Sequence, residues 1–184
     1  MTQQESLARK DIELAVRCAI WAALMAVGAY VSIPIGPVPI TLQSFFIILC
    51  GFMEGPWAFF PALAYLLAGI IGLPVFAEGA AGPGILFGPS GGFALSFAPC
   101  AFVAGFAAIR PKPWKYLVFG ALATILMHLC GIMGMHLSLN LSWVASLYAD
   151  LPFLPGAGLK VIAAAALAAG ALRFPWARKY GSQS

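Results

Sequence analysis

The chain carries very little charge. Only 9% of its 184 residues are Asp, Glu, Lys or Arg, whereas 62% are hydrophobic. A soluble domain needs a much larger charged fraction to cover its surface, so this composition excludes a soluble globular protein and indicates a polytopic membrane protein. A helix that crosses a bilayer needs about 20 mainly apolar residues. The length therefore predicts roughly six spans in one compact helical domain.

Sequence signals for energy conversion, metal binding and cofactors are also missing. We find no P-loop, no glycine fingerprint for a dinucleotide and no internal repeat. His128 and His136 are eight residues apart, not four as in a helical metal pair, so we expect polar packing or hydrogen-bonding roles for them. The cysteines lie in apolar segments without CxxC spacing, which favours buried reduced thiols. They are Cys18, Cys50, Cys100 and Cys130. We expect neither a resident metal nor a cofactor, and no ATP hydrolysis by this chain.

Positive charge is confined to three clusters and one isolated lysine. The clusters are Arg9, Lys10 and Arg17; Arg110, Lys112 and Lys115; and Arg173, Arg178 and Lys179. Six crossings place all three clusters on the same side, which the positive-inside rule assigns to the cytoplasm. The clusters explain the net charge of +4 without any nucleic-acid partner. Lys160 lies at the opposite end of the last apolar span. Because a positive charge at that end does not help to set the membrane orientation, Lys160 either binds a ligand or extends its ammonium to the lipid headgroups.

The order of apolar runs and helix breakers predicts where the crossings fall. The expected spans are 14–33, 40–71 as two short helices divided by Glu54, Gly55 and Pro56, 91–109, 116–137 and 156–174. Residues 72–90 are too rich in Gly and Pro for a spanning helix. We expect an outward-facing loop that dips into the protein, where irregular backbone is tolerated only if it is buried or lines a cavity. The prediction is an all-α membrane protein with a six-helix domain at 14–174 and cytoplasmic tails at 1–13 and 175–184.

Three segments rich in Pro and Gly converge on the outer side in this topology. They are IPIGPVPITLQ at 33–43, the loop at 72–92 and YADLPFLPGAGLK at 148–160. Such segments allow the backbone to approach a small ligand closely. GPVPITLQ, GLPVF followed by FGPSGG, and PFLPG with a lysine four residues on make the chain resemble the BioY family. This family consists of the biotin-binding S components of energy-coupling-factor (ECF) vitamin transporters.

The resemblance implies that biotin is captured on the outer side of the plasma (inner) membrane, with Lys160 binding its valerate carboxylate. The family motif usually has an aspartate three residues before this lysine, where the chain has Ala157. Other polar groups must then contact the ureido ring, which offers two N–H donors and one carbonyl acceptor. The candidates are Asp150, Glu78, Gln43, Ser90 and Asn140. Aromatic residues on the same side either wall the pocket or form the interfacial belt. They are Phe76, Phe87, Phe93, Trp143, Tyr148 and Phe153.

Small residues recur every four positions on the first span. Ala19 with Ala23, and Ala22 with Ala26, would let another helix approach closely, either inside this protein or in a partner. The resemblance implies that this face docks on the ECF transmembrane coupling subunit, and that a pair of ATPases supplies energy. Two alternatives remain, an S component for another vitamin and an intramembrane enzyme. The enzyme would use Glu78, Asp150 or His136 as acid or base, but no motif gives Ser90 a basic partner.

Overall fold

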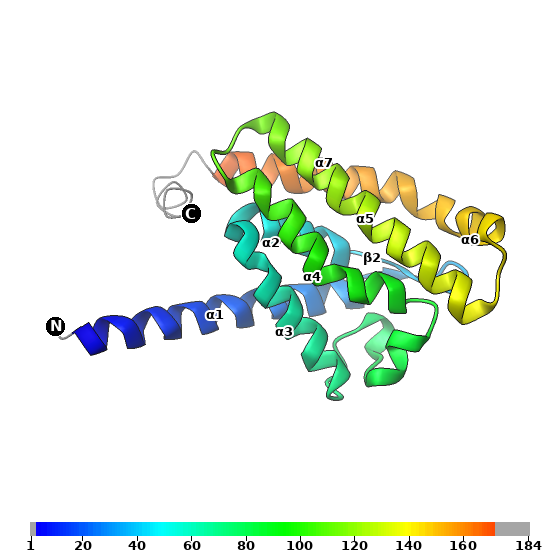
Figure 1. Ribbon diagram of the computed structural model, residues 1–184, viewed down its shortest axis with the longest axis horizontal. Coiled ribbons are helices and arrows are strands. Elements are labelled where there is room, and N and C mark those ends of the chain that lie inside the picture. Colours follow the sequence, from blue (N-terminus) through cyan, green and yellow to red (C-terminus); the bar gives the residue numbers. More distant parts are fainter. Residues whose placement is uncertain (1–2, 172–184) are drawn as a thin grey trace.

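A computed structural model describes residues 3–171 of the chain, and it is almost entirely helical (Figure 1). The α-helices are α1 (Gln3–Tyr30), α2 (Gln43–Glu54), α3 (Phe59–Ile70), α4 (Gly91–Gly105), α5 (Pro113–Leu139), α6 (Trp143–Asp150) and α7 (Leu154–Ala171). Short 3-10 segments are η1 (Gly55–Ala58), η2 (Ala77–Gly79), η3 (Pro83–Phe87), η4 (Phe106–Ala108) and η5 (Leu151–Phe153). An all-α membrane protein is therefore confirmed.

Five helical stretches of the described chain are long and apolar enough to cross a membrane. They are Asp11–Tyr30, Gln43–Ile70, Gly91–Ala108, Pro113–Leu139 and Trp143–Ala171. The difference from six lies in Gln43–Ile70, where α2 and α3 have 12 residues each. A helix of that length rises about 18 Å, less than the hydrocarbon core of about 30 Å. The break falls at the predicted place, because Gly55 adopts φ 67° and Pro56 lacks an N–H.

The ends of the predicted spans need several corrections. Helix α1 begins at Gln3 and ends at Tyr30, and Ile40–Thr41 is a strand instead of the start of a helix. These two residues (β2) pair antiparallel with Ser32–Ile33 (β1). Strands of two residues have no period to detect, so no pattern in the sequence marks this hairpin. Helix α7 begins at Leu154, and the end expected at residue 174 lies outside the described residues.

Helix α6 lies in a segment that the apolar runs predict to be a connection. Ser142 begins it, because its side-chain oxygen accepts a hydrogen bond from the Ala145 N–H at 3.2 Å. Asn140, at φ 52°, ends α5 in the left-handed conformation that Asn tolerates. Figure 1 shows the α5–α6 connection on the right, whereas the α4–α5 connection and the end of α7 lie on the left. The α5–α6 connection therefore lies at the opposite end of the helix bundle from the α4–α5 connection.

The irregular segment at 72–90 is fixed to the helices by hydrogen bonds. The Tyr30 hydroxyl on α1 donates to the Pro74 carbonyl at 2.6 Å, and Gly82 N–H donates to the Gly69 carbonyl on α3 at 2.8 Å. Phe76 is 4% exposed, so the loop inserts a large side chain into the protein. This agrees with the expectation that the segment dips inward.

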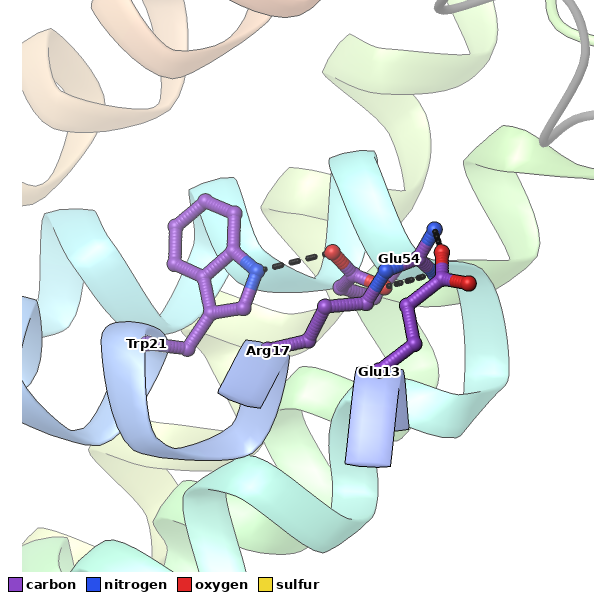
Figure 2. A network of polar contacts seen from close by, with 4 residues as sticks. All are labelled: Glu13, Arg17, Trp21 and Glu54. Carbon is purple, nitrogen blue, oxygen red and sulfur yellow. Dashed lines mark hydrogen bonds and ion pairs between the residues drawn. The ribbon is translucent and has the colours of Figure 1, made fainter. Parts of the chain in front are cut away.

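Glu54, the acidic residue inside the apolar stretch, is paired with α1 (Figure 2). Its carboxylate accepts a hydrogen bond from Trp21 Nε1 at 2.9 Å and from Arg17 Nη1 at 3.3 Å. Arg17 also contacts Glu13 at 3.0 Å. These contacts hold the C-terminal end of α2 against α1, which explains how a charged residue is accommodated between two apolar helices.

Candidate functional site

A cavity lies where the β-hairpin, the 72–90 loop and four helices meet. Its volume is about 90 Å³. The helices that contribute side chains are α2, α4, α5 and α7. The residues that line it are Val38, Pro39, Ile40, Thr41, Gln43, Ser44, Ile48, Phe76, Ala77, Ile85, Ser90, Phe93, Ala94, Phe97, Thr124, Met127, His128, Phe153, Ala157 and Lys160. All three Pro- and Gly-rich segments identified in the sequence contribute to this wall.

Lys160 reaches from α7 across to the start of α2. Its Nζ donates to the Thr41 carbonyl at 2.6 Å and to the Ser44 hydroxyl at 3.1 Å. An ammonium has three N–H donors, so one remains for another acceptor. Lys160 forms no ion pair with a residue in the described range 3–171. A partly buried cation without a carboxylate is poorly stabilised, so this end of the cavity is suited to an anionic group.

Gln43 connects three elements of the cavity wall through hydrogen bonds. Its Nε2 donates to the Tyr65 hydroxyl at 2.6 Å, and this hydroxyl donates to the Val75 carbonyl in the loop at 2.7 Å. The amide thus links α2, α3 and the 72–90 loop. Gln43 therefore acts mainly as a support, with part of its surface on the cavity.

Two phenylalanines form aromatic walls, and each ring lies directly on a glycine. Phe76 packs on Gly69 and meets the Tyr65 ring edge to face at 5.7 Å. Phe93 packs on Gly131 of α5 and lies 5.9 Å from the Phe153 ring. A Cβ atom at either glycine would overlap the ring. The glycines therefore set how far each ring extends into the cavity.

The α5 wall contributes polar groups. His128 Nδ1 lies 2.8 Å from Asp150 Oδ1, and these residues are 9% and 2% exposed. Thr124, one helical turn earlier, has a buried hydroxyl with no hydrogen-bond partner among the described residues. Nowhere in residues 3–171 do three or more His, Cys, Asp or Glu side chains gather as metal ligands.

The predicted binding residues divide into two groups. Lys160, Gln43, Phe76, Ser90 and Phe93 line the cavity. Phe153 and Ala157 line it too, whereas Phe87 is exposed on the outside.

The other predicted residues, Glu78, Trp143, Tyr148 and Asp150, do not line the cavity. Trp143 and Tyr148 are 57% and 67% exposed, because α6 turns its other face, with Ser146 and Asp150, toward the protein. Trp143 stacks on His136 at 4.0 Å. Glu78 and Asn140 are exposed at turns where φ is positive. Only Asp150 approaches the cavity indirectly, through His128.

Four polar residues that line the cavity are absent from the predicted ligand contacts. Thr41 and Ser44 flank the predicted Gln43, but Thr41 acts through its backbone carbonyl, which side-chain chemistry cannot reveal. The spacing of the histidines predicts packing or hydrogen bonding for His128, and its bond to Asp150 agrees with that. The only signal for Thr124 is its spacing of four residues from His128, which places both on one face of a helix.

The alanines of α1 form two different faces. Ala22 and Ala26 pack against the core of the protein, whereas Ala19 and Ala23 are exposed. Docking of a partner at these alanines stays a prediction. Of these four, Ala19 and Ala23 alone remain fully available to another helix.

Comparison with known proteins identifies the family of the chain. The BioY family model matches residues 1–175. The biotin transporter BioY of Thermotoga maritima is 38% identical over 119 residues, which cover 64% of this chain and 70% of that protein. The biotin transporter BioY of Rhodobacter capsulatus is 38% identical over 159 residues, which cover 77% and 83%.

A solved structure has the same fold over nearly the whole length. It is the crystal structure of the S-component for biotin from an ECF-type ABC transporter, with a TM-score of 0.83, 25% sequence identity and 95% of each chain covered. The shared fold and the match over residues 1–175 lead to one conclusion. The chain belongs to the BioY family.

Proposed function

We propose that the protein is the biotin-binding membrane component of a vitamin uptake transporter, a multi-pass protein of the plasma membrane. The observation that carries this proposal is the Lys160 ammonium, which lies at the cavity with two hydrogen bonds and no carboxylate partner within residues 3–171. Biotin has one carboxylate on a flexible apolar chain and a fused ring at the other end. The names of the relatives, which are biotin transporters, support the same ligand.

The two ends of the ligand fit two parts of the wall. The carboxylate accepts from Lys160 Nζ, which makes a charge-assisted hydrogen bond. The bicyclic ring lies between the Phe76 and Phe93 walls, where apolar and aromatic surface is removed from water. The lining is mainly apolar with a few polar groups, as is typical of small-molecule sites.

Competitive titration of the detergent-purified protein tests this function. Biotin should bind and should not be displaced by an excess of thiamine or riboflavin. If thiamine or riboflavin binds and biotin does not, the protein is an S component for another vitamin. Recovery of a chemically altered biotin would instead favour the intramembrane enzyme.

For the membrane topology, we propose six crossings, in which α2 and α3 are each shorter than the hydrocarbon core and form a hairpin with its turn at Gly55–Ala58 on the inner side. Both termini then lie in the cytoplasm, with tails at 1–13 and 175–184 around the 14–174 membrane domain. The clustered cations support this orientation, although the third cluster lies outside the described residues. The cavity and the 72–90 loop face outward.

Cysteine labelling of intact cells checks this topology. In a background without Cys18, Cys50, Cys100 and Cys130, single cysteines placed at 81–84 should react with a membrane-impermeant maleimide from outside. Cysteines placed at 111–112 should react only after permeabilisation, because this connection carries a basic cluster. The reverse pattern would contradict both the topology and an outward-facing cavity.

For partners, we propose that α1 docks on the ECF transmembrane coupling subunit, which is driven by a pair of ATPases. The exposed Ala19 and Ala23 support this proposal, because small residues permit close helix packing in lipid. Delivery of biotin inward then depends on the partner complex, since this chain has no P-loop of its own.

Substitution Ala23→Trp should block docking. Biotin binding to the isolated protein should stay unchanged, while uptake and co-purification of the coupling subunit should be lost, because a bulky ring prevents close helix packing. Ile162→Trp, at an exposed position on α7, is the matched control and should have normal uptake. Normal uptake by both variants would show that this face of α1 contacts only lipid.

A further inference from the structure

The cavity has a second polar region, on α5, which Lys160 does not explain. Thr124 and His128 are four residues apart on α5 and both line the cavity. Lys160 and Ala157 lie on α7, and Ala157 offers only a methyl group to the ligand. Polar contacts to the ligand ring must therefore come from another wall.

The hydrogen bond to Asp150 determines which nitrogen of His128 remains for a ligand. Nδ1 lies 2.8 Å from Asp150 Oδ1, a distance at which Nδ1–H would donate to an ionised carboxylate. A neutral imidazole then has a lone pair on Nε2, at the far edge of the ring. Asp150 is 2% exposed and lies at the end of α6, so its contact with Nδ1 holds the orientation of the ring and directs Nε2 away from α6.

Thr124 supplies the complementary donor. Its Oγ1 is buried and lacks a hydrogen-bond partner within residues 3–171, a state that costs free energy unless a ligand or a water pairs with it. Ser90 and Gln43 also line the cavity, and Gln43 donates one N–H to Tyr65 and accepts from Thr41 Oγ1 at 3.5 Å. Phe93 meets the His128 ring edge to face at 6.1 Å, so the polar groups adjoin the aromatic wall.

We propose that Thr124 and His128 recognise the ureido ring of biotin, and that Asp150 is a positioning residue acting through His128. The Thr124 hydroxyl donates to the ureido carbonyl, and His128 Nε2 accepts from one ureido N–H. This assignment rests on the proposed function, since it concerns the other end of the same ligand. In this assignment, Lys160 binds the carboxylate of biotin, whereas Thr124 and His128 bind its ring.

Binding of three ligands to the purified protein tests this assignment. The ligands are biotin, 2-iminobiotin at neutral pH, where N–H groups replace the carbonyl oxygen, and biotin amide, which lacks the carboxylate. Thr124→Val keeps the shape and removes the hydroxyl. It should lower the preference for biotin over 2-iminobiotin about tenfold, because one neutral hydrogen bond is lost. Its preference for biotin over the amide should match that of the wild type.

Two variants at the histidine pair complete the test. His128→Phe keeps a ring but removes Nε2, and should also weaken biotin binding about tenfold. Asp150→Asn should weaken biotin binding in the wild-type background and leave it unchanged in the His128→Phe background, because the effect of Asp150 passes through His128. A merely structural Asp150 would weaken biotin binding in both backgrounds.

The outcomes separate the two proposals. If the wild type does not bind biotin, the proposed function fails. If the wild type binds biotin, Thr124→Val keeps its full preference for biotin over 2-iminobiotin and His128→Phe keeps its full affinity for biotin, the ring is recognised elsewhere and this assignment is overturned.

Discussion

Substitution Lys160→Ala should weaken biotin binding about tenfold to a hundredfold or more. A hydrogen bond to a charged group contributes about 1.5 to 3 kcal/mol, and about 1.4 kcal/mol corresponds to a tenfold change in affinity. The alanine variant removes the ammonium that bonds to Thr41 and Ser44 and leaves the carboxylate without its cation. Isothermal titration of the purified variants measures the effect.

Biotin amide separates the charge from other roles of Lys160. The wild type should prefer biotin strongly over the amide, and Lys160→Ala should lose most of this preference. Lys160→Arg should restore binding only in part, because the guanidinium is larger and directs its donors differently. An equal loss for both ligands would show that the lysine only fixes the start of α2 through Thr41 and Ser44.

Substitution Gly131→Ala should displace the Phe93 ring into the cavity. Alanine is the better helix former, so α5 itself would not be weakened. The new methyl group overlaps the Phe93 ring, and overpacking of this kind costs about 1 to 3 kcal/mol. We expect biotin affinity to fall about fivefold to a hundredfold, together with a lower thermal unfolding temperature of the purified protein.

Two further variants show whether the contact with Phe93 is the cause. Gly158→Ala on α7 has no heavy atom within 4 Å of the new Cβ and should bind biotin normally. Adding Phe93→Leu to Gly131→Ala relieves the overlap and should recover part of the unfolding temperature. Unchanged affinity in Gly131→Ala would mean that the ligand does not contact this wall.

Composition and helix breakers are enough to predict the membrane class and most of the helices. The break at Gly55 and Pro56 and the irregular 72–90 segment depend on local backbone properties of Gly and Pro, which tertiary packing seldom overrides. The isolation of Lys160 is visible in the sequence because charge is so scarce elsewhere. Local chemistry therefore identifies the three segments that contribute to the cavity wall and the cation at one end of it.

Contacts that depend on tertiary packing are not visible in the sequence. The His128 and Asp150 pair forms only because α6 folds back along α5, and α6 itself has eight residues and one cap signal at Ser142. The Thr41 carbonyl carries no side-chain chemistry. Trp143 and Tyr148 lie near the predicted end of the bundle, which is why the pocket is expected to include them, but their helix turns them outward.

Binding of intact biotin is tested most directly by analysis of the ligand that purifies with the protein. Cells expressing the protein are grown with isotopically labelled biotin, the protein is purified, and the ligand is extracted for mass spectrometry. We predict labelled biotin of unchanged mass in the wild type and its loss in Lys160→Ala. A different vitamin, a chemically altered biotin, or the same biotin content in wild type and Lys160→Ala would contradict a biotin site built around this lysine.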